Sequence, residues 1–274
     1  MTGLLDKFNI ENKVIIITGG EGIIGGNLAF ELAGLGARIC IIGINEPAGQ
    51  AIKKRITDKQ GHALFYNTNV LNRDALIRAR NSIISEWGTI DILINAAGGN
   101  SPAGTVGERQ SIFDINIDDF RAVSELNLDG TVIPSLVFGE HMSEKREGVI
   151  LNFSSMTAGR AVSRVAAYSA AKSSVENFTR WMATEMAFKF GDKIRVNAIA
   201  PGFLVSRQNR DLLLTAEGSP TDRGRDIIRH TPFGRFGEPD ELTGTVLWLI
   251  SDASSFVTGA VIPVDGGFSA YSGV

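Results

Sequence analysis

Tyr168 and Lys172 are the residues of this sequence whose types and spacing best suit acid–base chemistry. Residues four apart share one face of a helix, so the spacing places an ammonium group one turn from a phenol. The unperturbed pKa of tyrosine is about 10, and a nearby positive charge lowers it by favouring the phenolate. Ser155 follows the apolar run 149–153 and could hydrogen-bond the oxygen that Tyr168 protonates or deprotonates. Because many helices carry Tyr and Lys at this spacing, the pair indicates an active site only beside a site for a hydride carrier.

A glycine-rich turn near the N-terminus meets that condition. The β-branched run Val14–Ile17 predicts a strand buried in a parallel sheet, and a helical stretch follows the turn and continues through Leu35. Between them, Gly20, Gly22 and Gly25 fit the pattern G-x-G-x-x-G. Without Cβ atoms the backbone can approach a pyrophosphate, which the free N–H groups of the helix N-terminus attract. An ordinary tight turn is the alternative, but the strand–turn–helix context favours a dinucleotide site.

The form of the cofactor depends on the end of the next predicted strand, Arg38–Ile42. An acid is expected there to hold the adenosine ribose hydroxyls, or a base to hold a 2′-phosphate. Gly43 stands at the strand end instead, and Asn45 could make one hydrogen bond. Glu21, in the glycine turn, would repel a 2′-phosphate. These residues favour NAD as the cofactor and leave NADP open.

Strand and helix patterns alternate along the rest of the chain. Such alternation predicts parallel strands joined by right-handed crossovers, and hence an α/β fold with helices on both faces of an open, doubly wound sheet. The absence of a linker or a composition break predicts a single domain over 1–274. The further predicted strands are 63–67, 90–94, 149–153, 194–200 and 260–264, and the further predicted helices are 46–59, 73–87, 118–142 (interrupted at 127–130 and by Pro134), a helix through Tyr168 to about 190, and 239–250.

Two polar segments interrupt this alternation. Asn100–Ile117 is either a solvated surface insertion or the rim of a substrate pocket. The segment 203–233 has no simple period, follows the carboxyl end of a predicted strand and is rich in arginine, so it is a candidate lid. His230 lies within it and is expected to be a surface residue rather than a catalyst.

Composition excludes several classes of function. The chain has 274 residues, a formal net charge of -3 and 21% charged residues, with no basic run that would indicate a nucleic acid or a membrane surface as partner. Its single cysteine, Cys40, lies in an apolar run, so no internal disulfide is possible and a cytoplasmic location is expected. Residues 1–12 lack the pattern of a secretion signal, and no apolar run approaches a membrane span. No metal site is expected.

With these pieces together, the chain resembles the short-chain dehydrogenase/reductase family along essentially its whole length. The residues that carry the resemblance are Thr18-Gly19 with Gly25, Asn69-Val70, Asn95-Ala96-Ala97-Gly98, Asn127, Ser155, Tyr168, Lys172 and Pro201-Gly202. The family implies one Rossmann-like domain with a seven-stranded parallel sheet. One departure is Ile23, which stands where the family usually has the glycine two before Gly25.

The resemblance implies a role for each matching residue. Tyr168 would be the general acid/base, Lys172 would lower its pKa and bind the nicotinamide ribose, Ser155 would orient the substrate oxygen, and Asn127 would hold a water in the proton relay. The remaining residues implied or expected to border the cofactor are Gly19, Glu21, Gly22, Ile23, Ile24, Gly25, Asn45, Asn69, Val70, Asn95, Ala96, Ala97, Gly98, Pro201, Gly202, Leu204 and Ser206.

A closer likeness is to the short-chain-type D-mannonate oxidoreductases (fructuronate reductases). It rests on Gly98-Gly99-Asn100, Ala200-Pro201-Gly202-Phe203, Gln208-Asn209-Arg210, the segment 230–239 and the tail 265–274. A sugar acid needs a cation for its carboxylate and amides for its hydroxyls. Arg164, and Arg207 or Arg210 in the candidate lid, are candidates for the carboxylate. Asn100, Gln208 and Asn209 are candidates for the hydroxyls, beside Ser155 at the reacting oxygen.

Alternatives remain within and beyond this branch. Gluconate 5-dehydrogenase and 3-oxoacyl thioester reductase are the other enzymatic interpretations, although the polar stretch Gln208-Asn209-Arg210 speaks against an acyl substrate. A non-catalytic nucleotide-binding protein would have no reason to keep Ser155, Tyr168 and Lys172 together. The family also implies a homotetramer that pairs the helices around Asn127 and Tyr168.

Overall fold

Seven parallel strands form one sheet in the order β3-β2-β1-β4-β5-β6-β7. The computed structural model describes residues 3–206 and 209–273. The strands lie within two residues of the bounds that the sequence predicts, since continuous apolar runs bounded by polar turns mark strands buried on both faces. They are β1 Val14–Thr18, β2 Arg38–Gly43, β3 His62–Asn67, β4 Ile92–Asn95, β5 Gly148–Phe153, β6 Ile194–Pro201 and β7 Val261–Val264.

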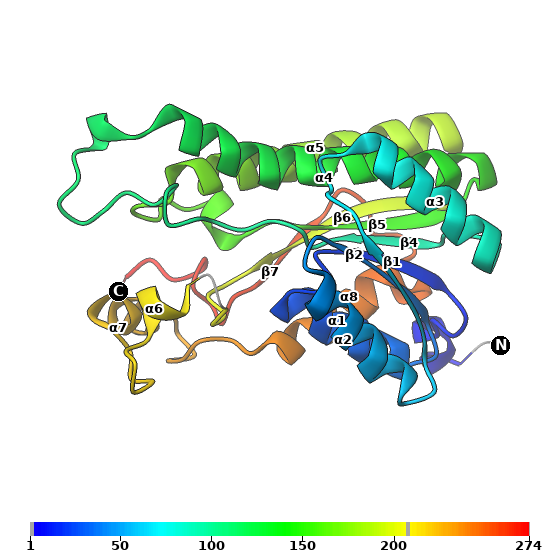
Figure 1. Cartoon of the computed structure of the whole chain (residues 1–274), viewed down its shortest axis with the longest axis horizontal. Helices are drawn as coiled ribbons and strands as arrows, with labels where there is room; N and C mark the ends of the chain where they lie inside the picture. The colour runs from blue at the N-terminus through cyan, green and yellow to red at the C-terminus, as the bar shows by residue number, and fades with distance from the viewer. Residues whose placement is uncertain (1–2, 207–208, 274) are drawn as a thin grey trace.

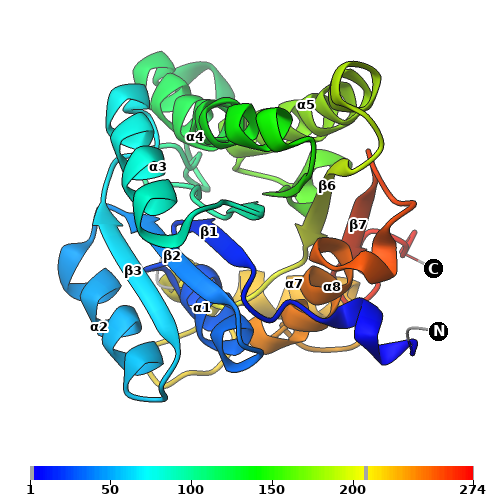
Figure 2. The ribbon, with the colours of Figure 1, turned by 90° about the vertical axis from the view of Figure 1, so that its right-hand side faces the viewer.

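Helices cover both faces of the sheet, as Figures 1 and 2 show, so the fold is the doubly wound, single-domain Rossmann-like fold that the sequence predicts. One layer holds α1 Ile23–Gly34, α2 Glu46–Thr57 and α8 Thr243–Ile250, and the other holds α3 Arg73–Trp87, α4 Ile117–Lys145 and α5 Ala166–Phe190. Successive residues of β1 belong alternately to the two apolar cores, Ile15 and Ile17 to one and Val14 and Ile16 to the other.

Short elements complete the connections. Helices α6 Arg210–Leu213 and α7 Asp222–His230 lie in the segment expected to be a lid, beyond the carboxyl ends of the strands, as Figure 1 shows. The 3-10 helices are Leu5–Phe8, Ile112–Asp114, Met156–Ala158, Pro239–Leu242 and Asp252–Ser254. In the described part of the chain, no helix combines the length and the apolar character needed to cross a membrane.

The predicted interruption of the helix after residue 117 is wrong, because α4 is one helix from Ile117 to Lys145 with Pro134 inside it. Its polar residues bond within the helix: the Thr131 hydroxyl donates to the Asn127 carbonyl oxygen at 3.0 Å, and the Ser135 hydroxyl donates to the Thr131 carbonyl oxygen at 2.7 Å. Gly130 faces the Val70 side chain, which a Cβ atom would approach to 3.2 Å. Tertiary packing therefore overrides the weak helix propensity of these residues.

The strand order locates the crevice. After β1 the chain moves to one side of the sheet, through β2 and β3, and β4 returns to pair with β1 on the other side. Ligands of such sheets bind at the carboxyl ends of the strands where the order reverses. The glycine turn follows β1 and Asn95–Gly98 follows β4, so both segments meet at this switch point.

Arg195, on β6, is a buried cation that bonds the end of α8. Its side chain is only 5% exposed overall and donates to the carbonyl oxygens of Leu249 at 2.9 Å and Ser251 at 3.0 Å, and to the Ser254 hydroxyl at 2.9 Å. A guanidinium suits the last carbonyls of a helix because it satisfies several acceptors and complements the helix dipole.

We therefore expect Arg195→Met to lower the free energy of unfolding by roughly 2–4 kcal/mol, since it leaves buried carbonyl groups without donors. Urea denaturation followed by circular dichroism measures the effect. Arg78→Met, at an exposed position of α3, is the matched control and should change stability by less than about 0.5 kcal/mol. Equal effects of the two substitutions would contradict the anchoring role.

Candidate functional site

The structure brings Ser155, Tyr168 and Lys172 together at the carboxyl end of β5. Ser155 follows the strand, and the first turns of α5 carry Tyr168 and Lys172. The Ser155 hydroxyl lies within hydrogen-bonding reach of the Tyr168 phenol, and Lys172 Nζ lies 5.6 Å from the centre of the Tyr168 ring. The spacing in the sequence predicted this grouping because residues four apart share a helix face.

Lys172 is enclosed. The residue is only 3% exposed, and its Nζ donates a hydrogen bond to the Phe153 carbonyl oxygen at 2.7 Å. Burial disfavours the charged ammonium and lowers the pKa of Lys172 to about 8. The side chain thus keeps a positive charge at neutral pH that a modest rise in pH removes.

The expected lowering of the Tyr168 pKa by Lys172 is wrong for this structure. Burial of the phenol raises the pKa of Tyr168, and the hydrogen bond from Ser155 lowers it by a smaller amount. The ammonium of Lys172 is directed to the Phe153 carbonyl, so desolvation dominates. Tyr168 as a residue is half-buried.

Asn127 connects α4 to the turn after β4. The residue is fully buried; its Oδ1 accepts from the Gly99 N–H at 2.9 Å, and its Nδ2 donates to the carbonyl oxygens of Gly99 at 2.7 Å and Val123 at 2.8 Å. These bonds engage the side-chain amide with protein groups and fix the turn against the helix. The sequence did not indicate this positioning of Gly99, because the contact joins segments distant in the chain.

The two turns at the switch point leave space that only glycines allow. Gly19 has φ +64°, and a Cβ atom on it would lie 2.8 Å from Ala97 Cα; a Cβ on Gly25 would overlap the Gly19 carbonyl. Gly98 has φ +149°, and its Cβ would lie 2.7 Å from Asn127 Oδ1 and 3.3 Å from Lys172 Nζ. Bare backbone therefore borders the crevice from the glycine turn to Lys172, which fits a dinucleotide.

The start of α1 fits the same ligand. Gly22 is the N-cap and has no side chain to bond the first N–H groups of the helix, which leaves those groups for an anion. Ile23 begins the helix and is 41% exposed, and Ile24 packs against the core. The departure from glycine at position 23 therefore places an isoleucine side chain on the surface without filling the turn.

Some expected cofactor residues have local roles. Asn45 Oδ1 accepts from the Ala48 N–H at 3.2 Å and caps α2, and Asn69 Oδ1 accepts from the Leu71 N–H at 3.0 Å. Val70 is buried. The oxygens of both amides therefore form turns, which leaves their nitrogen donors as the groups that could reach a ligand.

The segment after β6 continues along the same edge of the sheet. Pro201 ends the strand, and the Gly202 N–H donates to the Val264 carbonyl oxygen at 3.0 Å. Leu204 is 7% exposed and forms a bridge with Gly237. The Ser206 N–H donates to Asn209 Oδ1 at 2.7 Å.

Arg164 fixes the long loop that follows β4. It has φ +76°, its Nε donates to the Val106 carbonyl oxygen at 2.7 Å, and its own carbonyl accepts from the Val106 N–H at 2.9 Å. Asn100, in the same loop, donates through Nδ2 to the Thr105 hydroxyl at 2.6 Å, while its Oδ1 is buried without a partner among the described residues. The loop 100–116 is thus held over the start of α5.

The other substrate candidates are divided. Asn209 uses both ends of its amide locally, because Nδ2 donates to the Leu204 carbonyl oxygen at 2.9 Å and Oδ1 accepts from the Ser206 N–H. Its contact with a substrate hydroxyl stays a prediction, to be met by the remaining N–H and lone pair. Arg210 is exposed at the start of α6. Arg207 and Gln208 lie outside the described residues.

Arg223, on α7, is a candidate that sequence reasoning missed. Its guanidinium donates to the Ser163 hydroxyl and carbonyl, both at 3.2 Å. Burial and the positive charge of nearby Arg164 lower the pKa of Arg223. Glu108, whose Oε1 lies 3.8 Å from Arg164 Nη1 and whose charge acts in the opposite sense on Arg223, is the carboxylate beside this pair in the structure. The arginine-rich composition of the segment was the available signal, but the choice of Arg223 depends on how α7 packs.

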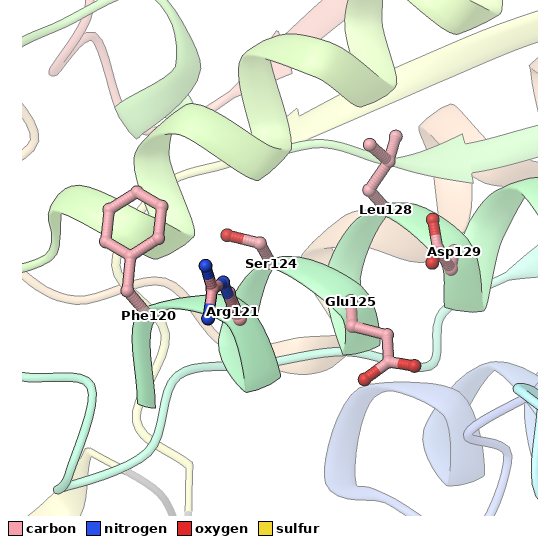
Figure 3. A pocket seen from close by; sticks show the side chains of 6 residues that line it. All are labelled: Phe120, Arg121, Ser124, Glu125, Leu128 and Asp129. Carbon is pink, nitrogen blue, oxygen red and sulfur yellow. The ribbon is translucent and has the colours of Figure 1, made fainter. Parts of the chain in front are cut away.

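A surface hollow of about 250 Å³ lies elsewhere, on α4 (Figure 3). Its lining residues are Phe120, Arg121, Ser124, Glu125, Leu128 and Asp129, and they include none of the predicted site residues. In the described ranges, no group of three or more His, Cys, Asp or Glu side chains could hold a metal ion. The candidate site is therefore the crevice defined by Ser155, Tyr168, Lys172 and the glycine turns.

Comparison with known proteins agrees with this geometry. A family model described as Enoyl-(Acyl carrier protein) reductase, of the short-chain dehydrogenase type, matches residues 21–269. A crystal structure of a protein from Haemophilus influenza, provisionally described as a D-mannonate oxidoreductase and containing bound NAD, has 45% sequence identity and a TM-score of 0.90, with 97% of this chain and 98% of that chain covered.

Two curated relatives extend the comparison. The "Uncharacterized oxidoreductase UxuB" of Bacillus subtilis is 44% identical over 275 residues, which cover 97% of this chain and 98% of the relative. The 2-dehydro-3-deoxy-D-gluconate 5-dehydrogenase of Formosa agariphila is 33% identical over 272 residues, which cover 98% of this chain and 97% of the relative. All of these similarities span nearly the whole chain.

The buried ammonium should cost stability. We expect Lys172→Met to raise the free energy of unfolding at pH 7 by about 1–3 kcal/mol, because burial lowers the pKa of Lys172 from 10.5 to about 8 and each pKa unit corresponds to roughly 1.4 kcal/mol. The lost hydrogen bond to Phe153 offsets part of this gain.

The sign follows from proton binding. Between pH 8 and 10.5 the unfolded chain binds the lysine proton more than the folded chain does, so the wild type gains stability as pH rises. The advantage of Lys172→Met should therefore shrink between these pH values. Urea denaturation at pH 7 and 9.5 measures it, and a Lys189→Met control, exposed near the end of α5, should show no such pH dependence. An advantage that grows with pH would contradict the argument.

Proposed function

This chain belongs to the short-chain dehydrogenase/reductase family, and we propose that it is an NAD-dependent oxidoreductase that interconverts D-mannonate and D-fructuronate. The observation that carries the proposal is the grouping of Ser155, Tyr168 and Lys172 beside the bare backbone of Gly98. The likeness to the NAD-containing structure from Haemophilus influenza supports both the cofactor and the sugar-acid substrate.

The proposed chemistry assigns the proton to Tyr168. When bound, NAD supplies the acceptor for the hydride that leaves the substrate carbon with its electron pair. Tyr168 takes the proton of the same hydroxyl in oxidation and returns it to the carbonyl oxygen in reduction. Ser155 hydrogen-bonds that oxygen and fixes its position next to the phenol.

The raised pKa of Tyr168 bears on direction. A phenol that holds its proton at neutral pH can protonate the carbonyl oxygen in reduction, and it must lose that proton before it acts as a base in oxidation. Lys172, whose pKa is about 8, keeps a positive charge at that pH, and its Nζ is held by the Phe153 carbonyl oxygen. Asn127 would contribute by holding the Gly98–Gly99 turn in place. We also propose that it holds a water molecule of the proton relay.

The substrate carboxylate would lie between Arg164 and Arg223. These residues come from the start of α5 and from α7, and their guanidinium groups are close enough for one charge to perturb the other. Asn100, with a buried oxygen that lacks a partner in the described part of the chain, would accept from a sugar hydroxyl. Arg210 and Gln208 remain proposed contributors from the lid, 203–233.

The main alternative is a different sugar acid, such as gluconate oxidised at carbon five. The 33% identical relative, named for a 5-dehydrogenase of a deoxy-gluconate, supports that class. A 3-oxoacyl thioester fits less well, because paired arginines suit a carboxylate better than an acyl chain. We propose a cytoplasmic location as well, in agreement with the buried, free Cys40.

We also propose a homotetramer. The outer faces of α4 and α5 expose large apolar side chains: Leu136 is 49%, Trp181 54% and Phe188 84% exposed. Such side chains favour burial against a second copy. The hollow on α4 in Figure 3 lies on the same helix and would accept side chains of the partner.

Initial rates on a panel of hexonates and hexuronates test the proposed activity. NADH-dependent reduction of D-fructuronate should have the highest kcat/KM, and Tyr168→Phe should keep NADH binding while it lowers kcat by at least about 100-fold, because the proton path is lost. Rates with gluconate-derived keto acids or 3-oxoacyl thioesters serve as comparisons. A higher kcat/KM on one of these, or substantial kcat in Tyr168→Phe, would contradict the proposal.

The carboxylate site has its own test. Arg223→Ala should raise KM for carboxylate substrates by about tenfold, which corresponds to about 1.4 kcal/mol, with a much smaller effect on neutral polyols. Arg229→Ala is the control on the same helix, since Arg229 is exposed and pairs with Asp226. Equal changes for charged and neutral substrates would remove Arg223 from the site.

A further inference from the structure

The carboxylate of Glu21 lies at the place where a Cβ atom on Gly43 would stand. Gly43 ends β2, and a Cβ atom built on it would overlap Glu21, whose Oε2, Cδ and Oε1 are its three nearest atoms. Glu21 itself belongs to the glycine turn after β1. The strand end therefore carries an acidic group although its own residue has no side chain.

This acidic group is fixed in place. Glu21 Oε1 accepts a hydrogen bond from the Ile44 N–H at 3.0 Å, which joins the glycine turn to the end of β2. Oε2 is buried against Gly43 and has no hydrogen-bond partner among the described residues. A carboxylate has about four acceptor positions, so this one retains capacity for a hydroxyl donor.

The position matters because the end of this strand lies beside the adenosine ribose in dinucleotide-binding sheets. In dinucleotide-binding sheets an acid about 20 residues beyond the glycine turn accepts from the adenosine ribose hydroxyls, and a basic residue nearby accommodates a 2′-phosphate. The three segments bordering this place, 19–25, 43–49 and 67–71, contain no Lys or Arg. They do contain Glu46, whose Oε2 accepts from Asn67 Nδ2 at 3.4 Å. The local charge therefore opposes a phosphate.

We propose that Glu21 takes over the part of the strand-end acid: it accepts from the 2′-hydroxyl of the adenosine ribose and rejects a 2′-phosphate. Gly43 is the residue that makes room for it. The inference rests on the proposed function only in that the chain binds a nicotinamide dinucleotide. Glu21 is thus the residue that sets the preference for NADH over NADPH.

Binding measurements with four variants test the assignment. We would titrate NADH and NADPH fluorescence to obtain Kd values, and record thermal unfolding of the same proteins without nucleotide. Glu21→Gln keeps the shape and removes the charge, so the ratio of Kd for NADPH to Kd for NADH should fall at least about tenfold from the wild-type value. Glu31→Gln, at an exposed acid of α1 outside the three bordering segments, is the matched control and should leave the ratio unchanged.

Two further variants move the acidic side chain from position 21 to position 43. Gly43→Asp alone should lower Tm and weaken both nucleotides, because its carboxylate would displace the Glu21 carboxylate from the Ile44 N–H and bring two negative charges together. The double variant Glu21→Ser, Gly43→Asp should recover Tm and restore the preference for NADH, since the acid then comes from the strand end. Failure of the double variant to recover Tm would show that the two side chains do not compete for one place, and would overturn the proposal.

The outcomes separate this proposal from the proposed function. If the wild type binds NADH tightly and the Glu21→Gln ratio is unchanged, Glu21 only bonds the Ile44 backbone and the assignment is wrong. A wild-type preference for NADPH would also overturn it. If the wild type binds neither nucleotide at millimolar concentration, the proposed function fails and the assignment fails with it.

Discussion

The crevice depends on a buried ammonium group held by a single carbonyl. Lys172 is enclosed by the end of β5, whose Phe153 carbonyl it bonds, and by the turn that begins at Gly98. That enclosure lowers its pKa to about 8 and sets it close to Tyr168. Gly98 has no Cβ atom, so its backbone can lie closer to the Lys172 ammonium than that of any other residue could. The geometry that makes the lysine useful is also what makes it costly to bury.

Both helices of one layer are needed to maintain this arrangement. α5 presents Tyr168 and Lys172, while α4 supplies Asn127, whose amide makes three hydrogen bonds and holds Gly99 in register with the helix. Replacement of Asn127 by an apolar residue would remove the partners of two groups of Gly99 in a partly buried place. The poor intrinsic helix propensity of asparagine is therefore outweighed by a tertiary contact, and the helix continues through it.

The sequence predicted most of the fold because each strand is a short apolar run between polar turns, and because glycines mark the turns at the crevice. It also predicted that Ser155, Tyr168 and Lys172 meet, since two of them share a helix face and the third ends a strand. The continuity of α4 could not be read from local propensity. The direction of the Tyr168 pKa was missed because pairwise spacing carries no information on desolvation, which is the larger effect here.

Long-range placement explains the remaining differences. Arg223 lies near Arg164 because α7 packs against the segment that precedes α5. The bonds of Asn209 to Ser206 and Leu204, by contrast, are local and depend on the turn that residues 204–209 form. The same reasoning applies to Glu21 and Gly43. A search for an acid at the end of β2 finds a glycine, and by sequence alone the position looks vacant. In space it is filled, because the turn after β1 passes beside the end of β2 and carries a side chain long enough to reach it. The physical requirement at such a site is a negative charge at one point in the crevice, and either of two backbone positions can supply it provided the other has no side chain.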